Sequence, residues 1–336
     1  MSRKIILVTG GLGLIGSTLI SKLNDIEKEA YIICVESFEN NEKWRYLQNL
    51  VIDELISVQE FKEKRTEIVE KSDYIFHLGA CSSTTEDSWK YLYHKNYRFT
   101  IDLIDLYIAS KRRNLNNSKK IVIASSASTY GDGNNGFRDD CNELENLKPL
   151  NPYGISKHLV DIYLKRKGYL SEVLSVKFFN IFGVNEYHKK NMRSIAHWGV
   201  ESLIKNKEIK LFKSRNPNYE DGKQVRDFLD VDTALNIMLY LNKHSSGIHN
   251  IGCGEAITWD EMAYTILNQL KSKENNLNLV YVDMPKHLIG KYQYYTKAEM
   301  TRSTLPKELI PKKENVLNKL AKYSLEIYED YYSNLI

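Results

Sequence analysis

Three side chains in the middle of the sequence have the types and spacing needed to move a proton to or from a substrate hydroxyl group. Tyr153 and Lys157 are four residues apart, which places them on one face of a helix. A charged Lys157 would lower the pKa of the Tyr153 phenol from its usual value of about 10. Ser126 follows an apolar run and would hydrogen-bond the same substrate oxygen. We therefore predict that Tyr153 is a general acid/base assisted by Ser126 and Lys157.

A glycine-rich segment near the N-terminus gives this pair its context. It reads Thr9-Gly-Gly-Leu-Gly-Leu-Ile-Gly16 and stands between a strand pattern and a helical pattern. Gly10 or Gly11 would allow a tight turn. Gly13 would let the backbone approach a pyrophosphate, and Gly16 would let the helix pack closely on the strand. The helix N-terminus would face the negative charge, so the segment predicts a dinucleotide-binding site.

The residues after the second predicted strand bear on which dinucleotide binds. Glu36 lies 20 residues beyond Gly16, where an acidic side chain accepts hydrogen bonds from the ribose hydroxyls of NAD. Lys43 and Arg45 follow closely, and either could pair with the 2′-phosphate of NADP. Lys157 would hold the nicotinamide ribose in both cases. The sequence predicts a nicotinamide cofactor and leaves the choice between NADP and NAD open.

The surrounding pattern shows which elements position these residues. We predict buried strands at 4–9, 30–35, 74–78, 120–125 and 171–180, and helices at 14–23, 96–110 and 152–167. Strands that alternate with helices favour an α/β fold with a Rossmann-type, doubly wound parallel sheet. Later residues predict helices at 194–206 and from 232, a short strand at 226–231 and a surface loop at 214–224. We expect an NAD(P)-binding domain over 1–180 and a smaller α/β substrate-binding domain over 181–336, with the chain crossing between them.

Composition narrows the class of protein. The 336 residues are 42% hydrophobic and 27% charged, with a formal net charge of +4 from 47 basic and 43 acidic side chains. This charge is too small and too dispersed to indicate a nucleic acid or a membrane as partner. The four cysteines are far apart, and no apolar run is long enough for a signal peptide or a membrane span. We expect free thiols, no metal site and a cytoplasmic location.

Longer motifs resemble those of one enzyme family. With its glycine turn and tyrosine–lysine pair, the chain is similar to the extended short-chain dehydrogenases/reductases, and more narrowly to bacterial ADP-glyceromanno-heptose 6-epimerases. The narrower resemblance rests on HLGACSSTTE at 77–86, KPLNPYGISK at 148–157 and NIFGVNEYHK at 180–189. It continues through Met192, Leu211-Phe212, Arg226-Asp-Phe228 and LIGKYQ at 288–293.

The resemblance implies a homo-oligomer with a tightly held NADP, NAD being less favoured, that acts on an ADP-activated heptose for lipopolysaccharide core or surface-glycan synthesis. The sugar would be oxidised at C6 and its carbonyl reduced again from the other face. The glycine turn and the resemblance together place cofactor contacts at Gly10, Gly13, Leu14, Ile15, Gly16, Glu36, Ser37, Lys43, Leu78, Gly79, Ala80, Cys81, Ser82, Asn96, Tyr153 and Lys157. Substrate contacts would be Ser126, Asn180, His188, Lys189, Phe212, Arg226 and Tyr292.

Two basic residues in this set have more specific expected roles. The fork of Arg226 suits bidentate binding of a diphosphate, although an ion pair with Asp227 or Asp230 is the alternative. Reduction from either face requires the carbonyl to rotate, so its oxygen leaves Tyr153 and needs a second proton donor. Within the resemblance, Lys189 is the candidate for that donor, and a phosphate anchor or a surface charge is the alternative.

Departures from the family pattern leave other functions open. The chain has Glu36-Ser37 where the family often has Asp-Asn. The position of a second family lysine, on the cofactor side, falls near Val58, and the position of a substrate-site histidine falls at Trp198. One alternative is a 4-epimerase or 4,6-dehydratase acting on a UDP-, GDP- or dTDP-hexose. Ala127-Ser128 stands where such dehydratases carry an acidic pair, which argues against dehydration. Another alternative is a catalytically silent NADP-binding regulatory subunit, but such chains usually lose part of the Tyr153–Lys157 pair.

Overall fold

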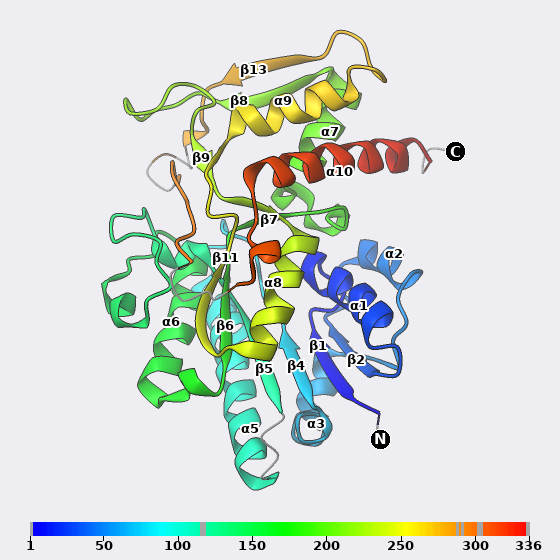
Figure 1. The fold of residues 1–336 in the computed structure, drawn as a ribbon, viewed down its shortest axis with the longest axis vertical. Coiled ribbons are helices and arrows are strands. Elements are labelled where there is room, and N and C mark those ends of the chain that lie inside the picture. Colours follow the sequence, from blue (N-terminus) through cyan, green and yellow to red (C-terminus); the bar gives the residue numbers. More distant parts are fainter. Residues whose placement is uncertain (1–2, 115–118, 287–288, 290–291, 301–304, 334–336) are drawn as a thin grey trace.

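The centre of the molecule is a seven-stranded parallel sheet (Figure 1). The computed structural model describes residues 3–114, 119–286, 289, 292–300 and 305–333, so the motif at 288–293 is described only in part. The strand order is β11-β6-β5-β4-β1-β2-β3. The strands are β1 (Ile5–Thr9), β2 (Tyr31–Glu36), β3 (Glu54–Ser57), β4 (Tyr74–His77), β5 (Lys120–Ser126), β6 (Leu174–Phe178) and β11 (Gly247–Ile251). This order confirms the predicted Rossmann-type, doubly wound sheet.

Helices cover both faces of the sheet. One face is covered by α1 (Leu14–Ile26) and α8 (Val231–His244), and the other by α3 (Val58–Lys71), α5 (Phe99–Asn114) and α6 (Pro152–Lys167). Because side chains alternate along a strand, Ile6 and Val8 pack against the first helical layer while Leu7 packs against the second. A strand buried on both sides needs a continuous apolar run, which is what β1 has.

A further layer lies beyond the carboxyl ends of the strands (Figure 1). It contains α7 (Ile195–Asn206), α9 (Trp259–Leu270) and α10 (Lys313–Ser333), with β8 (Glu208–Phe212) paired to β13 (Asn278–Val282). Two short pairs connect it to the sheet: β7 (Asn180–Phe182) with β10 (Phe228–Asp230), and β9 (Val225–Arg226) with β12 (Ile257–Thr258). Strand β11 belongs to the second half of the chain but completes the main sheet, so the chain crosses back from the further layer to the sheet. The domain boundary at residue 180 stays a prediction.

The structure differs from the expected elements in three places. The strand predicted at 171–180 divides into β6 and β7, and the strand at 226–231 divides into β9 and β10. The second break falls at Asp227, whose buried carboxylate accepts backbone hydrogen bonds from Cys253, Gly254 and Ala298. The helix expected at 96–110 is longer, with α4 (Trp89–Leu92), a π-helical turn at 93–98 and α5 in succession.

The sequence did not predict every element individually, but it predicted some elements closely. The elements β3, α2 (Trp44–Leu47) and α3 were not predicted individually. Helix α6 has the predicted bounds, since Asn151 caps its first turn through Gly154 N–H and Gly168 ends it in a left-handed conformation. The loop at 214–224 has no helix or strand, as predicted.

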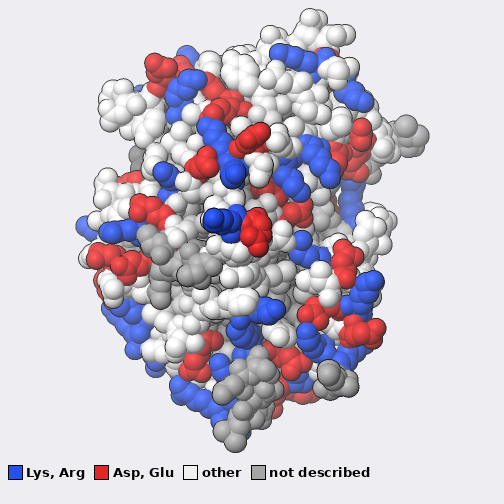
Figure 2. All heavy atoms as spheres, viewed as in Figure 1, with Lys and Arg blue, Asp and Glu red and all other residues white. Residues whose placement is uncertain are grey.

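The surface carries both signs of charge. On the face seen in Figure 2, basic and acidic side chains are interspersed, in keeping with the small net charge of +4. No helix in the described ranges is long and apolar enough to cross a membrane.

Candidate active site

A cleft of about 870 Å³ follows the carboxyl ends of β1, β2, β4 and β5. This is the edge of a doubly wound sheet where dinucleotides bind. Its walls include all but one of the predicted cofactor residues: Gly10, Gly13, Leu14, Ile15, Gly16, Glu36, Ser37, Lys43, Leu78, Gly79, Ala80, Cys81, Ser82, Tyr153 and Lys157. The sequence pattern thus identified residues that the fold brings together from several strands.

The glycine turn at the base of the cleft leaves no room for side chains. Gly10 has a φ of +68°, and a Cβ there would lie 2.5 Å from the Cα of Gly79. A Cβ on Gly16 would lie 2.2 Å from the carbonyl oxygen of Gly10. Gly13 precedes α1, whose N-terminal N–H groups face an anion favourably. The turn therefore fits a pyrophosphate held against backbone, as a dinucleotide site requires.

Asn96 is the predicted cofactor residue that does not line this cleft. It is fully buried in the π-helical turn, where its side chain accepts a hydrogen bond from Cys81 N–H (2.8 Å) and donates to Cys81 C=O (3.0 Å). It also donates to Ser156 on α6 (3.1 Å). The structure therefore places Asn96 behind the cleft wall, where it fixes the segment around Cys81.

Glu36 and Lys43 form an ion pair at the end of the cleft, with 3.0 Å between Lys43 Nζ and Glu36 Oε1. The Glu36 carboxylate also accepts hydrogen bonds from Leu12 N–H (3.1 Å) and Ser37 N–H (2.8 Å). Burial alone would raise the pKa of Glu36, but the Lys43 charge and these hydrogen bonds outweigh it and lower the pKa. Glu36 is therefore a charged group already engaged with its own chain.

Ser126, Tyr153 and Lys157 come together at the junction of β5 and α6. Ser126 ends β5 and Tyr153 lies in the first turn of α6, so the two side chains stand side by side on the cavity wall. Lys157 follows one turn later and donates a hydrogen bond to Ala124 C=O at 2.8 Å. The predicted catalytic group is thus one cluster, held by a strand end and a helix N-terminus.

The electrostatics of this cluster correct one sequence-based expectation. Burial raises the pKa of the Tyr153 phenol, and the nearby Ser126 hydroxyl offsets only part of that rise. Burial also lowers the pKa of Lys157 to about 8, while the nearby Asp161 carboxylate limits the fall. The expected lowering of the phenol's pKa is therefore not seen in this structure, because desolvation is the largest influence and Lys157 is not among the groups that shift the pKa.

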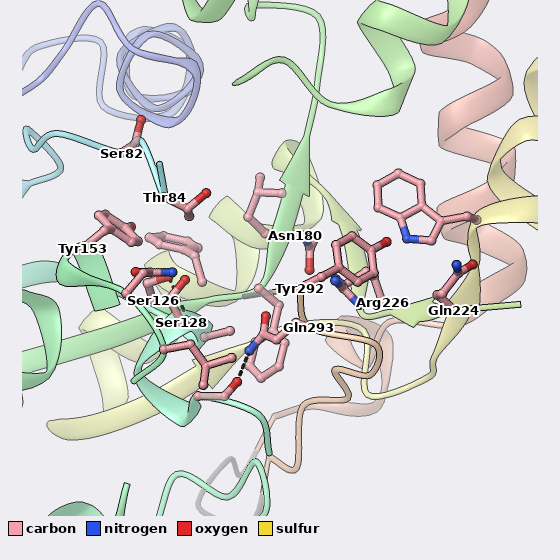
Figure 3. Close-up of a pocket in the computed structure, with 18 of the residues that line it drawn as sticks. Ser82, Thr84, Ser126, Ser128, Tyr153, Asn180, Gln224, Arg226, Tyr292 and Gln293 are labelled. Carbon is pink, nitrogen blue, oxygen red and sulfur yellow. Dashed lines mark hydrogen bonds between the residues drawn. The ribbon is translucent and has the colours of Figure 1, made fainter. Parts of the chain in front are cut away.

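A second pocket of about 730 Å³ opens from the same place. Ser126 and Tyr153 line both cavities, so they stand where the two meet. Figure 3 shows Tyr153, Ser126, Ser82 and Thr84 toward one end of the pocket and Arg226, Tyr292 and Gln224 toward the other. Asn180, Phe212, Arg226 and Tyr292, all predicted substrate contacts, line this pocket.

Arg226 is a buried cation without an acidic partner in the described residues. Its side chain is 6% exposed, its guanidinium carbon lies 4.9 Å from the centre of the Tyr292 ring, and one N–H donates to Val225 C=O at 3.0 Å. Asp227 accepts backbone hydrogen bonds instead, and Asp230 caps α8 by accepting one from Thr233 N–H. The alternative of an Arg226 ion pair with either aspartate is therefore excluded, and burial lowers the pKa of Arg226.

His188 and Lys189 lie on the wall of the cofactor cleft, and neither is among the residues lining the second pocket. The ring of His188 is hydrogen-bonded to the Tyr46 hydroxyl at 3.0 Å. Lys189 Nζ lies 3.2 Å from the carboxylate of Glu186, which is itself buried and hydrogen-bonded to Ser194. Their predicted contacts with substrate stay predictions, because the cleft they line is the one that fits the dinucleotide.

Comparison with known proteins agrees with this geometry. Residues 6–252 match the NAD dependent epimerase/dehydratase family. A protein of Nitratidesulfovibrio vulgaris named ADP-L-glycero-D-manno-heptose-6-epimerase is 37% identical over 298 residues, which are 88% of this chain and 89% of that protein. One of the same name from Fusobacterium nucleatum is 34% identical over 308 residues, 89% of this chain and 90% of the relative. The chain belongs to the ADP-L-glycero-D-manno-heptose-6-epimerase family.

Solved structures of related proteins share the fold of this epimerase family member. The Helicobacter pylori ADP-L-glycero-D-manno-heptose-6-epimerase superposes with a TM-score of 0.76 at 23% identity, covering 97% of this chain and 96% of that one. A UDP-N-acetylglucosamine 4-epimerase from Methanobrevibacter ruminantium gives 0.74 at 23%, covering 97% and 99%. At this identity the likeness shows the fold alone. Family membership confirms an epimerase with a nicotinamide cofactor, and NADP and NAD remain undistinguished.

Sequence reasoning did not select several residues of this epimerase's second pocket. They include Gln224, Trp259 and Gln293, whose side chains come from three segments far apart in the chain. Gln224 is the last residue of the loop at 214–224. The turn-rich composition of this loop predicted a segment beside a ligand, but it did not single out Gln224. Trp198 also lines the pocket, at the position where the family pattern has a histidine.

Proposed function

We propose that the protein converts ADP-D-glycero-D-manno-heptose into ADP-L-glycero-D-manno-heptose by transient oxidation and re-reduction at C6. The observation that carries this proposal is the place of Tyr153 and Ser126, which line both the dinucleotide cleft and the second pocket. A proton-transferring group must stand at such a junction if a sugar hydroxyl is to meet the nicotinamide. The names of the curated relatives supply the sugar, and a role in lipopolysaccharide or surface-glycan synthesis follows from it.

A bound nicotinamide cofactor would supply the hydride chemistry at C6. The chain's own residues fit such a group: the glycine turn has no space for side chains, and the N-terminus of α1 opens onto the cleft. Lys157 lines that cleft with its ammonium group held by Ala124 C=O, in position to hold a ribose hydroxyl. Because hydride leaves and returns within one turnover, the cofactor has no need to dissociate.

Tyr153 would accept the proton of the C6 hydroxyl when the sugar is oxidised, and it would return that proton only when the carbonyl is reduced from the same face. To do so it must first be deprotonated, and burial works against this because it raises the pKa of the phenol. The nearby Ser126 hydroxyl lowers the pKa of Tyr153 and partly offsets that effect. Ser126 is itself fixed by Ser128 N–H, which donates to its Oγ at 3.1 Å. The serine therefore both orients the substrate oxygen and stabilises the phenolate.

Arg226 would bind the diphosphate of the nucleotide sugar. A buried guanidinium with no carboxylate partner among the described residues is costly unless a ligand supplies the negative charge. Its planar fork matches two phosphate oxygens, and the ring of Tyr292 holds one face of that fork. Phe212 and Tyr292 then stand near the nucleoside, where they could flank the base.

We further propose NADP as the natural cofactor. Lys43 uses one of its three N–H donors for Glu36 at 3.0 Å, which leaves two for a 2′-phosphate. Glu36 already accepts hydrogen bonds from Leu12, Ser37 and Lys43, so it is less available to ribose hydroxyls. Purified protein should release NADP on denaturation, and Lys43→Ala should shift the retained cofactor toward NAD. Release of NAD alone from the unmodified protein would overturn this choice.

Lys189 is proposed as the second proton donor, used when the rotated carbonyl oxygen has left Tyr153. It lines the same cleft as Tyr153 and Lys157, and Glu186 holds its ammonium group. The test is a single-turnover half-reaction: protein loaded with the reduced cofactor reduces an ADP-hexose whose C6 aldehyde carries deuterium. Proton NMR of the monodeuterated alcohol then reports which face received the hydride. Lys189→Met and Tyr153→Phe should impair hydride transfer to the two aldehyde faces in opposite order. Equal loss at both faces, with a raised KM alone, would reduce Lys189 to an anchor.

The central experiment mixes purified protein with ADP-D-glycero-D-manno-heptose and follows inversion at C6 by proton NMR. Turnover of this substrate supports the proposal. Turnover of a UDP- or GDP-hexose without it would instead favour a 4-epimerase. The cytoplasmic location and the homo-oligomer are proposals from the family resemblance, to be tested by fractionation and by sedimentation.

A further inference from the structure

The strongest unexplained feature of the second pocket is the side chain of Gln224. It is 1% exposed, and its amide Nε2 donates a hydrogen bond to Phe212 C=O at 3.1 Å. Its Oε1 is buried and accepts no hydrogen bond from any residue that the structure describes. Buried acceptors nearly always have a partner, because leaving one unsatisfied costs free energy. An acceptor of this kind in the wall of a ligand pocket indicates a donor on the ligand.

The place of Gln224 indicates which part of the ligand carries that donor. Figure 3 shows Gln224 at the end of the pocket away from Tyr153, with Arg226 between the two. If Arg226 binds the diphosphate, the sugar lies on the Tyr153 side and the nucleoside lies on the Gln224 side. Phe212 and Trp259 also line the pocket, and both are hydrogen-bonded to Gln224 through a backbone group, so they lie beside it. Aromatic rings suit a flat base.

Gln224 is also held in a fixed orientation. The backbone carbonyl of Gln224 accepts a hydrogen bond from the backbone N–H of Trp259 at 3.2 Å. The backbone N–H of the following residue, Val225, donates to the backbone carbonyl of Tyr294 at 3.0 Å. Just before it, Lys223 forms an ion pair with Asp260 at 3.0 Å. Turning the amide over would bring Oε1 against the carbonyl of Phe212, so the arrangement leaves an acceptor, not a donor, for the ligand.

We propose that Gln224 is a specificity-determining residue that reads the nucleobase by accepting a hydrogen bond from an exocyclic amino group, the 6-amino group of adenine. The inference rests on the proposed function, which places a nucleoside diphosphate at Arg226. A base that presents a carbonyl oxygen at this position meets the Gln224 oxygen and is disfavoured. A base with hydrogen there loses the bond and leaves the acceptor unpaired.

The test measures binding of three nucleotides by isothermal titration calorimetry on the protein as purified. They are ADP, purine riboside 5′-diphosphate, which has hydrogen in place of the 6-amino group, and inosine 5′-diphosphate, which has a carbonyl there. The unmodified protein should bind ADP about tenfold more tightly than the purine riboside nucleotide. It should bind the inosine nucleotide more weakly than either.

Gln224→Leu should abolish this preference by weakening ADP binding while leaving the affinity for the purine riboside nucleotide nearly unchanged. Gln224→Met, closer in shape, is the second variant if the first does not fold. Asn218→Ala is the matched control, since it changes an exposed residue of the same loop and should keep the preference for ADP.

Equal binding of ADP and the purine riboside nucleotide by the unmodified protein overturns the inference without any variant. An undiminished preference in the Gln224 variants overturns it as well. Neither measurement needs the heptose or turnover. If no nucleoside diphosphate binds, the proposed function fails; if nucleotides bind without a preference for the amino group, only the role of Gln224 fails.

Discussion

Lys177 and Arg226 are both buried cations, but their surroundings differ. Lys177 lies on β6 and is fully buried, with its Nζ 3.5 Å from the Asp161 carboxylate and 4.2 Å from the centre of the Tyr130 ring. This ion pair supplies its opposite charge, and Nζ makes no hydrogen bond among the described residues. The Asp161 carboxylate also accepts hydrogen bonds from Ser125 (2.9 Å) and Ser175 (2.8 Å). Arg226 faces the second pocket with an aromatic ring and one backbone carbonyl as its neighbours.

This difference in surroundings distinguishes residues that stabilise the fold from residues that bind a ligand. A buried charge that meets an opposite charge and hydroxyl donors within its own chain is compensated when the chain folds. A buried charge or acceptor that lacks such a partner is compensated only when a ligand arrives. By the criterion of an opposite charge, Asp161 and Lys177 support the fold behind α6, whereas Arg226 belongs to the binding surface. Mutations on the two sides should therefore change different measured quantities.

The largest expected effect is on the pocket side, in Tyr153→Phe. Turnover should fall about 10²–10⁴-fold because the variant removes one proton-transferring oxygen and little volume. The melting temperature and the bound cofactor should be unchanged. Tyr163→Phe is the control on the same helix, since that hydroxyl bonds only to Asp105 at the surface among the contacts described. NMR turnover assays decide the matter, and a Tyr153→Phe variant within threefold of the unmodified protein would make the phenol a packing residue.

A comparable effect on stability is expected on the core side, in Lys177→Met. Removing the ammonium group leaves the Asp161 carboxylate buried with two serine donors, which should cost about 3–5 kcal/mol in the free energy of unfolding. The double variant Asp161→Asn/Lys177→Met should recover much of this loss, since no unpaired charge remains. Urea unfolding curves measure both. A double variant no more stable than Lys177→Met alone would contradict this prediction, because the loss would then not come from an unpaired carboxylate.

A smaller effect, on binding alone, is expected for Arg226→Leu. Losing charge-assisted hydrogen bonds to the diphosphate should raise the KM for the nucleotide sugar about 10–100-fold. The free energy of unfolding should stay the same or increase, because an uncompensated buried charge is removed. The KM of Arg226→Lys should lie between those of the unmodified protein and Arg226→Leu, because lysine keeps the charge but lacks the planar fork. Destabilisation by Arg226→Leu would place this residue with Lys177 on the scaffold side.

The last prediction concerns the pH dependence of stability at Lys157, which lies between the core and the pocket. Burial lowers the pKa of Lys157 from 10.5 to about 8. Between about pH 8 and pH 10.5, Lys157 is therefore neutral in the folded protein and protonated in the unfolded chain. The stability that comes from a neutral Lys157 is complete above pH 10.5 and is lost as the pH falls through about 8. Relative to Lys157→Met, the unmodified protein should gain at most about 1.4 kcal/mol per pH unit across this range. A flat difference between the two urea-unfolding series would show that Lys157 keeps its ordinary pKa.

Local sequence determined the fold class and the catalytic cluster. The apolar run of β1, the glycines after it and the Asn151 cap of α6 act through neighbours in the chain, so their pattern is visible without the structure. The spacing of Tyr153 and Lys157 belongs to one helix, and the cofactor residues cluster in short motifs at strand ends. Parallel strands bring those ends to one edge, which is why nearly all of them line one cleft.

Only the tertiary structure decided which charges and polar atoms find partners. The sequence left Arg226 free to pair with Asp227 or Asp230; packing instead turned Asp227 toward three backbone N–H groups and left the guanidinium in the pocket. Burial reversed the expected shift of the Tyr153 pKa, because desolvation depends on atoms brought in from distant segments. The unsatisfied oxygen of Gln224 likewise depends on Phe212, whose carbonyl takes the amide nitrogen. Such partnerships are set by three-dimensional contact, and spacing along one chain does not encode them.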